Sequence, residues 1–454
     1  SRAAARAVEP GHQHALAQRR RLSPAPGLQR GTARGHVAGW QPAQTRRSLF
    51  QPIDPERTQF VQDLAQVGAS SGAVAARPEQ RRQAVAPDPA GLEAEQGQQG
   101  GRASMRRDVY LEREPAETAL VQARDQQLRK GFQVMFMQGM DPPLHTRQRA
   151  LVHRTFTPRT IERLRPRTEA LVAAALDRAS TTGTIELMAE LASPLPATII
   201  MEMLGIPLAG QPLVRAAAAT IAEFLSLVDP AEGQLAAIAA RLADFAAYLA
   251  PQIAQRREHP QDDLLSALVT VELDGERLGE PELLVLTTML LFAGHETTTN
   301  LIGNGAWTLA TRPDQWQLLQ ANPALVAPAV EEMLRHDTSV QFVPRWVREP
   351  LELGGKQLEP GQRVLLNFAA ANRDPALVPD PDRFDLTRPP SRHLAFGQGP
   401  HHCLGVALAR LEAQVVFSAL VARAPKLALD PAHPPTRKPS VVLRGPATLH
   451  LRLT

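Results

Sequence analysis

Phe396-Gly397-Gln398-Gly399-Pro400-His401-His402-Cys403-Leu404-Gly405 carries the only cysteine of this 454-residue chain. Two glycines and a proline before Cys403 predict a tight, irregular loop, because Gly reaches positive φ cheaply and Pro lacks an N–H donor. A helix rich in Ala and Leu is predicted directly after the loop, over residues 406–416. Cys403 is therefore expected where a loop meets a helix N-terminus, and the backbone N–H groups there favour a thiolate. A thiolate so placed is a metal ligand or a nucleophile.

A lone cysteine is more often a small buried apolar side chain, and that alternative holds for an arbitrary position. Here the cysteine stands in the pattern F-G-x-G-x-H-x-C-L-G, which resembles the heme-binding loop of the cytochromes P450, the heme-thiolate monooxygenases. The resemblance implies that Cys403 ligates the iron of heme b (iron protoporphyrin IX). It also implies that Phe396, His401 and Gly405 contact the cofactor.

A second segment, Asp141-Pro142-Pro143-Leu144-His145-Thr146-Arg147-Gln148-Arg149, opens a helix predicted to reach Phe156. His145 and Arg149 are four residues apart and share one helix face, which in isolation indicates a solvated basic face. The segment resembles the family's D-P-P-x-H-T-x-x-R, in which this His and Arg bind the heme propionates. Arg345, in a strand predicted over 340–346, matches a third propionate ligand of the family.

Residues 281–311 are predicted to form a long helix through the protein interior. Pro281 suits a first turn, the run 283–293 has almost no polar face, and the length corresponds to roughly 45 Å. Its middle reads Ala293-Gly294-His295-Glu296-Thr297-Thr298. A glycine and a buried carboxylate both lower the stability of a helix. Residues that lower stability in this way are expected at functional sites. A solvated Glu beside a back-bonded Thr is the structural alternative.

The same segment resembles the family's A-G-x-[DE]-T-T. The resemblance implies that Gly294 opens the helix over the heme, and that Glu296 and Thr297 deliver protons during oxygen activation.

Glu332 and Arg335 form an E-x-x-R pair, a spacing that usually gives a weak surface ion pair. Pro381-Asp382-Arg383-Phe384 resembles the P-x-R-F segment of the family. Together these motifs imply that Glu332, Arg335 and Arg383 form a buried charge network that supports the cysteine loop. His393 resembles a histidine that recurs near that loop.

Apolar residues from several segments are candidates for the substrate wall: Leu290, Ala293, Val340 and Val343. Phe224, Leu225, Leu227 and Val228 are interpreted either as the roof of the same pocket or as ordinary core. A strand is predicted over 363–368, a helix over 159–178, and a final hairpin over 441–453.

Charge and cysteine content exclude several classes of protein. The net charge is +4, but residues 1–107 hold 16 Arg against 8 Asp and Glu, so the rest of the chain stands at −4. We therefore expect no nucleic-acid partner. One cysteine excludes structural disulfides and Cys-rich metal sites and fits a reducing cytoplasm. No apolar run approaches the ~20 residues of a spanning helix, so no membrane association is expected.

The chain is expected to divide at about residue 104. Residues 1–104 are of low complexity, apart from a possible helix at 58–67, and we expect an extension that is disordered or artefactual, since the first methionine is Met105. Residues 105–454, with a first helix predicted over 115–130, are expected to form the heme domain. The resemblance implies a mainly α fold of triangular helical architecture with a small β subdomain.

The implied function is insertion of one oxygen atom of O2 into an apolar small molecule, by hydroxylation or epoxidation. The chain has no G-x-G-x-x-G fingerprint, so electrons are expected from a separate ferredoxin or flavodoxin with its NAD(P)H reductase. This partner is predicted to dock near the cysteine loop, where Arg392, Arg410 and Arg423 are candidates. A peroxide-driven peroxygenase and a non-catalytic heme-binding protein are the alternatives.

Overall fold

A computed structural model describes residues 137–454 except 155, 227–233, 273–274 and 276. The expectations for residues 1–104, the helices at 58–67 and 115–130, and the side chains of Leu227 and Val228 lie outside the described residues.

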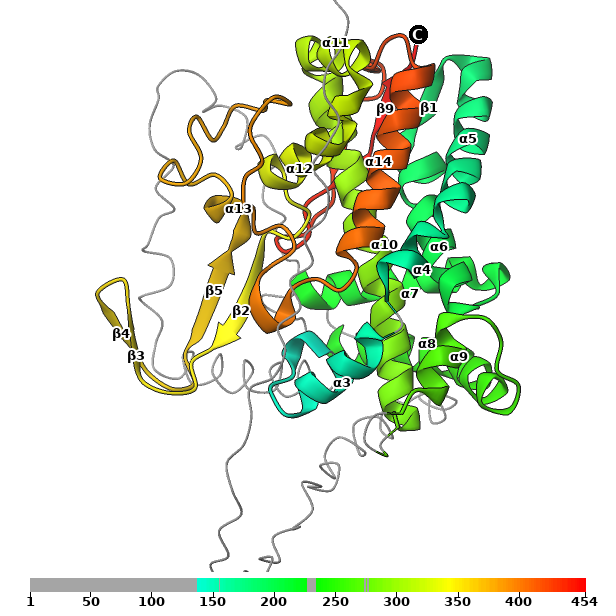
Figure 1. The fold of residues 1–454 in the computed structure, drawn as a ribbon, viewed down its shortest axis with the longest axis vertical. Helices are drawn as coiled ribbons and strands as arrows, with labels where there is room; N and C mark the ends of the chain where they lie inside the picture. Colours follow the sequence, from blue (N-terminus) through cyan, green and yellow to red (C-terminus); the bar gives the residue numbers. More distant parts are fainter. Residues whose placement is uncertain (1–136, 155, 227–233, 273–274, 276) are drawn as a thin grey trace, which may run out of the picture. The chain divides into compact units, whose positions relative to one another are not determined.

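The described part is mainly helical, as predicted (Figure 1). Its α-helices are α3 (Leu144–His153), α4 (Pro158–Glu162), α5 (Arg165–Thr182), α6 (Pro194–Leu204), α7 (Gln211–Ser226), α8 (Gln234–Glu258), α9 (Leu264–Thr270), α10 (Glu280–Ala310), α11 (Pro313–Ala321), α12 (Val326–His336), α13 (Phe368–Ala371) and α14 (Val406–Arg423). A π-helical turn, η4 (Met188–Ala192), and short 3₁₀ turns connect some of them, including η7 (Gly399–His401) before the cysteine.

Helix α10 is the central helix of the described part, and it confirms the helix predicted over 281–311. Its first turn is capped by Glu282, whose carboxylate accepts a 2.8 Å hydrogen bond from the Gly279 N–H. Leu283, Leu286 and Leu291 are buried, and each contributes about 1.5–3 kcal/mol of hydrophobic stabilisation. The helix contacts α6, α7, α8, α12 and α14, so the residues at its middle are held from all sides.

Helix α14 continues directly from the cysteine loop and lies beside α10 (Figure 1). It confirms the helix predicted over 406–416 and extends it to Arg423. It also packs against α5 and α12 through buried side chains that include Leu411, Val416 and Phe417. The loop that carries Cys403 is thus anchored at its C-terminal end in the core.

Small antiparallel sheets complete the fold. Strand β9 (His450–Arg452) pairs with both β1 (Thr184–Glu186) and β6 (Ala428–Leu429), and β7 (Thr436–Arg437) pairs with β8 (Pro446–Thr448). Strand β2 (Phe342–Trp346) pairs with β5 (Arg363–Asn367), which confirms both predicted strands. Strands β3 (Leu351–Leu353) and β4 (Lys356–Leu358) form a hairpin whose turn, Gly354-Gly355, has positive φ at both residues.

Three predicted elements differ from the structure. The helix predicted over 159–178 is two helices, α4 and α5, with Pro166 in the first turn of the second. The helix predicted from 141 to 156 ends at His153. The hairpin predicted over 441–453 is wrong, because β8 pairs with β7 and β9 pairs with β1 and β6. Only Leu449 separates β8 from β9, which is too short a connection to turn the chain back on itself.

Candidate functional site

A large apolar cavity lies among α10, β2, α3 and the cysteine loop. Its volume is about 390 Å³. Its walls include every residue predicted to contact cofactor or substrate, namely His145, Arg149, Leu290, Ala293, Val340, Val343, Arg345, Phe396, His401, Cys403 and Gly405. Gly294 and Thr297 also line it, and so do Phe224 and Leu225, while Glu296 does not. The structure thus gathers residues from five separate segments around one space.

The cysteine loop is a succession of tight turns that presents Cys403 to the cavity. Gly397 and Gly399 have φ values of 66° and 75°, which favour glycine. The Cys403 N–H donates to the Phe396 carbonyl at 2.9 Å and fixes the backbone of the loop. Cys403 counts as exposed because its surface faces the open space of the cavity. Protein nevertheless surrounds the thiol closely enough to remove most of its hydration.

Burial raises the pKa of the Cys403 thiol, against the opposing effects of the Gly405 N–H, Arg149 and Arg410. The expected effect of a backbone N–H is present at Gly405, directly before helix α14 begins at Val406, but the loss of hydration outweighs it. A positive charge beside the sulfur would favour the thiolate.

Cationic and imidazole groups gather at one side of the cavity. The rings of His145 and His401 lie with their centroids 4.1 Å apart. Burial first, and then the charges of His145, Arg345 and Arg149, lower the pKa of His401 to about 4. Burial and Arg149 likewise lower the pKa of His145. The cluster therefore repels further positive charge and favours an anionic ligand.

One polar atom of this cluster has no partner in the described structure. His145 is 2% exposed, and its Nε2 is buried without a hydrogen bond. An orphaned buried nitrogen in the wall of a cavity indicates that a ligand completes its hydrogen bonding. Arg149 reaches the same region, where its Nη2 donates to the His402 carbonyl and ties α3 to the cysteine loop. A planar cofactor with a metal near Cys403 and acidic groups near His145 fits this site.

The middle of α10 forms the opposite wall, and it is a continuous helix there. The predicted opening at Gly294 is not observed. A Cβ at Gly294 would lie 2.9 Å from Cγ1 of Ile200 in α6, so the glycine is required for the close approach of these two helices. The Thr297 hydroxyl donates to the Ala293 carbonyl at 2.8 Å and stands in the cavity wall.

Glu296 is buried but points away from the cavity. Its Oε1 accepts a hydrogen bond from Nζ of Lys438 at 2.5 Å, and the two side chains form a partly buried ion pair. Its neighbour His295 contacts the Ser193 hydroxyl at 3.2 Å. Nothing in the sequence indicated Lys438, which lies 142 residues further along the chain.

Behind the cysteine loop, Glu332 and Arg335 form the predicted buried pair, but the third member of the network differs from the prediction. Arg335 donates to both carboxylate oxygens of Glu332, at 2.7 and 2.8 Å. The Arg383 side chain is 62% exposed and pairs with Asp385, so its predicted place in the network is wrong. Arg388 binds Glu332 Oε1 at 3.2 Å instead. The chain around Arg383 has no regular secondary structure, and Arg383 contributes only its backbone carbonyl, which accepts hydrogen bonds from Arg335 and Arg388.

Other side chains near the loop are engaged in ion pairs, one of which joins α12 to α14. His393 contacts Glu331 Oε2 at 3.1 Å, and Arg410 binds both oxygens of that carboxylate at 2.7 Å. Burial opposes ionisation of Glu331, but the hydrogen bonds from His393 and Arg410 outweigh it and lower the pKa to about 2. The Arg410 guanidinium also lies 5.0 Å from the centroid of the Phe396 ring, which positions the start of the loop.

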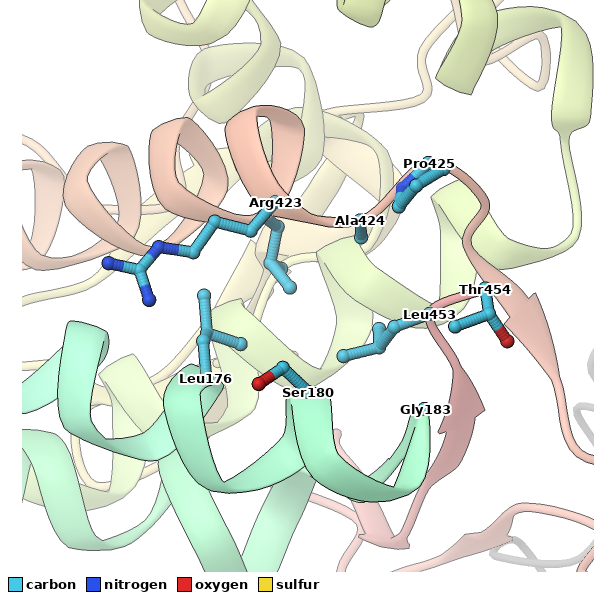
Figure 2. A pocket seen from close by; sticks show the side chains of 9 residues that line it. Leu176, Ser180, Gly183, Arg423, Ala424, Pro425, Leu453 and Thr454 are labelled. Atoms are coloured by element: carbon cyan, nitrogen blue, oxygen red, sulfur yellow. The ribbon is translucent and has the colours of Figure 1, made fainter.

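A second cavity, of about 360 Å³, lies between α5 and the end of α14 (Figure 2). Leu176 and Ser180 come from α5, and Leu453 and Thr454 from the C-terminal segment. The Arg423 side chain extends along its edge and pairs with Asp177. Of the residues named in the sequence analysis, Arg423, a candidate for partner docking, lines this cavity, and none of those predicted to bind cofactor or substrate does. We therefore assign the function to the first cavity.

Cys403 faces the cavity, and His145, His401, Arg149 and Arg345 lie in its wall; such a set of side chains suits a metal-containing cofactor with acidic groups. The comparisons give the family: the chain matches the family model "Cytochrome P450" over residues 106–449, and it belongs to this family. The chain is accordingly an oxidoreductase, a heme-thiolate monooxygenase that uses O2 and a redox partner.

Relatives of known sequence and structure agree. The chain is 45% identical to cytochrome P450 monooxygenase PikC of Streptomyces venezuelae over 294 residues, which covers 64% of this chain and 69% of PikC. It is 42% identical to vitamin D(3) 25-hydroxylase of Pseudonocardia autotrophica over 292 residues, covering 64% and 70% of the two chains. The structure of PksS from Bacillus subtilis 168 superposes with a TM-score of 0.65 at 37% identity, covering 70% and 81%.

None of the helices that the structure describes combines the length and the apolar character that crossing a membrane requires.

Proposed function

We propose that residues 105–454 form a heme domain in which heme b lies between α10 and the cysteine loop, with Cys403 as the ligand of the iron. The observation that carries this proposal is that Cys403 and the orphaned Nε2 of His145 face the same cavity. A thiolate at one point of the cavity and cationic groups at its edge match the two polar parts of this cofactor, its iron and its propionates.

The cluster of His145, His401, Arg149 and Arg345 would bind the propionates. His145 and His401 offer ring nitrogens, and Arg149 and Arg345 offer charged guanidinium groups. Charge-assisted hydrogen bonds of this kind are about twice as strong as neutral ones. They would also offset the burial, and after it the neighbouring positive charges, that lower the pKa of both histidines.

When bound, the heme supplies the oxidation, in which O2, two electrons and two protons convert a C–H bond into C–OH and release one water. The residues of the chain position the substrate and move protons. Leu290, Ala293, Val340 and Val343 form an apolar wall that excludes water and holds an apolar substrate. Thr297 places its hydroxyl in the cavity, and Glu296, one residue before it, is the carboxylate that would exchange protons with solvent.

The electron donor would be a ferredoxin or flavodoxin with its NAD(P)H reductase. It would approach the side of the cysteine loop away from the cavity, where Arg392 is exposed. Arg410 and Arg423, the other candidates for this surface, are each held in an ion pair within the chain. The single cysteine suits a reducing compartment, and we place the protein in the cytoplasm.

Two measurements test this function. The pyridine hemochromogen spectrum of the purified protein should identify heme b at one equivalent per chain, and extraction of a different heme would contradict the cofactor assignment. Thr297→Ala should divert reducing equivalents from product to hydrogen peroxide at unchanged heme content. Unchanged coupling in this variant would count against the proton-delivery role of Thr297 and favour the peroxide-driven alternative.

A further inference from the structure

We propose that Lys438 is a positioning residue that holds Glu296 outside the cavity, and that the loop carrying Lys438 releases Glu296 when the cavity is filled. This inference rests on the proposed role of Glu296 in proton delivery. It concerns the loop of residues 438–445, between β7 and β8, which we call the C-terminal loop.

The first observation is the direction of the Glu296 side chain. Glu296 is 7% exposed and absent from the cavity wall, although Gly294 and Thr297 on either side of it are present there. Its carboxylate is held by Lys438, whose side chain is 25% exposed. A carboxylate turned away from the reacting space cannot pass a proton into it, so the ion pair must open before Glu296 can act.

The second observation is that the same loop forms part of the cavity. Val442 and Leu443 line the cavity, four and five residues after Lys438. The loop is internally bonded, since the Lys438 N–H donates to the Gly445 carbonyl at 3.1 Å and the Leu443 N–H to the Ser440 hydroxyl at 3.0 Å. A displacement of Val442 is therefore transmitted to Lys438 within a short, bonded unit.

The third observation is that the loop also touches other parts of the cavity wall. The hydroxyls of Ser440 and Ser226 lie 2.7 Å apart and join the loop to the end of α7, the helix that contributes Phe224 and Leu225 to the wall. At the other end of the loop, a Cβ at Gly445 would lie 2.1 Å from Oδ1 of Asn300 on α10. Residues 442–444 are also fixed to the segment before β2, because the Gln341 N–H donates to the Val442 carbonyl and the Arg444 N–H to the Ser339 carbonyl, both at 2.8 Å. The part of the loop that is left to move is therefore residues 438–441, which carries Lys438.

These contacts define a coupling. An apolar substrate that fills the cavity presses on Val442 and Leu443. The hydrogen bond from Leu443 to Ser440 passes this displacement to residues 438–441, and Nζ of Lys438 separates from Oε1 of Glu296. Glu296 can then turn toward Thr297 and the cavity. Without substrate the pair stays closed, which restrains wasteful reduction of oxygen.

The test measures substrate-free oxygen consumption by the holoenzyme with spinach ferredoxin and its reductase. Lys438→Met should raise the rate at least threefold, and Lys438→Arg should restore it to within twofold of the wild type. Arg444→Met is the matched control: it removes a cation from the same loop, but one whose partner is Asp337 rather than a residue of α10, and it should leave the rate unchanged. A rate in Lys438→Met equal to that of the control would overturn the proposal.

The Glu296→Gln background separates this inference from the proposed function. Adding Lys438→Met to Glu296→Gln should leave substrate-free oxygen consumption at the level of Glu296→Gln alone, because Lys438 acts through Glu296. If the increase caused by Lys438→Met persists in the Glu296→Gln background, only the inference is refuted. If coupling is unchanged in Thr297→Ala, the proton-delivery role fails and the inference falls with it.

A second readout does not depend on turnover. Hydrogen exchange of the Lys438 and Leu443 amides in the wild-type holoenzyme should accelerate at least tenfold when the cavity is filled with 4-phenylimidazole. In Lys438→Met these amides should exchange fast with or without the probe. Equal protection of the wild-type loop in the free and probe-bound holoenzyme would contradict a loop that responds to occupancy.

Discussion

Replacing Glu332 by alanine should destabilise the holoprotein by about 3–5 kcal/mol, the range found when one partner of a buried ion pair is removed. The Arg335 side chain is 0% exposed and that of Glu332 4%. Without the carboxylate, the guanidinium of Arg335 stays buried with only backbone carbonyls as partners. The Asp385 N–H also loses its acceptor, to which it donates at 3.0 Å.

The chain contains a matched control. Glu162 and Arg165 are spaced i, i+3 like Glu332 and Arg335, but their side chains are 62% and 37% exposed. Glu162→Ala should cost far less than Glu332→Ala, because solvent screens this pair. Equilibrium unfolding of both holoprotein variants in urea, followed by circular dichroism and heme absorbance, gives the two free energies. If Glu332→Ala costs no more than Glu162→Ala, burial of the charge network does not stabilise the cysteine loop.

Three further predictions follow from the geometry. Arg388→Ala should cost at least about 1.5 kcal/mol of unfolding free energy and Arg383→Ala less than about 1 kcal/mol, because only Arg388 binds the buried carboxylate of Glu332. The same urea titrations measure both values, and the reverse order would restore Arg383 to the charge network. Gly294→Ala should cost about 1–3 kcal/mol through overpacking, and Ile200→Val should recover part of that loss in the double variant, whereas strictly additive effects would argue against the contact. Burial and Arg373 lower the pKa of His336 from 6.5 to about 4, so the folded state favours the neutral ring. About 3 kcal/mol of unfolding free energy should therefore be lost as the pH falls from 6.5 to 4. His336→Gln should flatten this part of the pH–stability curve, and an unchanged slope would refute the lowered pKa of His336.

Local sequence signals predicted the parts of the site that regular structure positions. The apolar run 283–293 and the Ala- and Leu-rich run after Cys403 each determine their own helix, so α10 and α14 could be placed without knowledge of their neighbours. Helix spacing placed His145 and Arg149 on one face, while their role at the cavity was implied only by the resemblance of their segment to the family. Once these helices pack, the segments that carry the cavity residues are brought together.

Residues whose roles depend on irregular or distant chain were missed. Arg388 rather than Arg383 reaches Glu332, because the chain between them has no period from which side-chain direction can be read. Lys438 was missed because its partner lies 142 residues away on α10. The opening expected at Gly294 is instead a site of close packing against Ile200, a contact that sequence spacing cannot reveal.

Ligation of the heme iron by Cys403 is tested most directly by the absorption spectrum of the dithionite-reduced, carbon monoxide-saturated protein. The wild type should show the red-shifted Soret band of thiolate-ligated heme, and Cys403→Ser should lose that band while its circular dichroism stays native. A red-shifted band that persists in Cys403→Ser, or a wild type that binds heme without showing the band, would contradict Cys403 as the ligand.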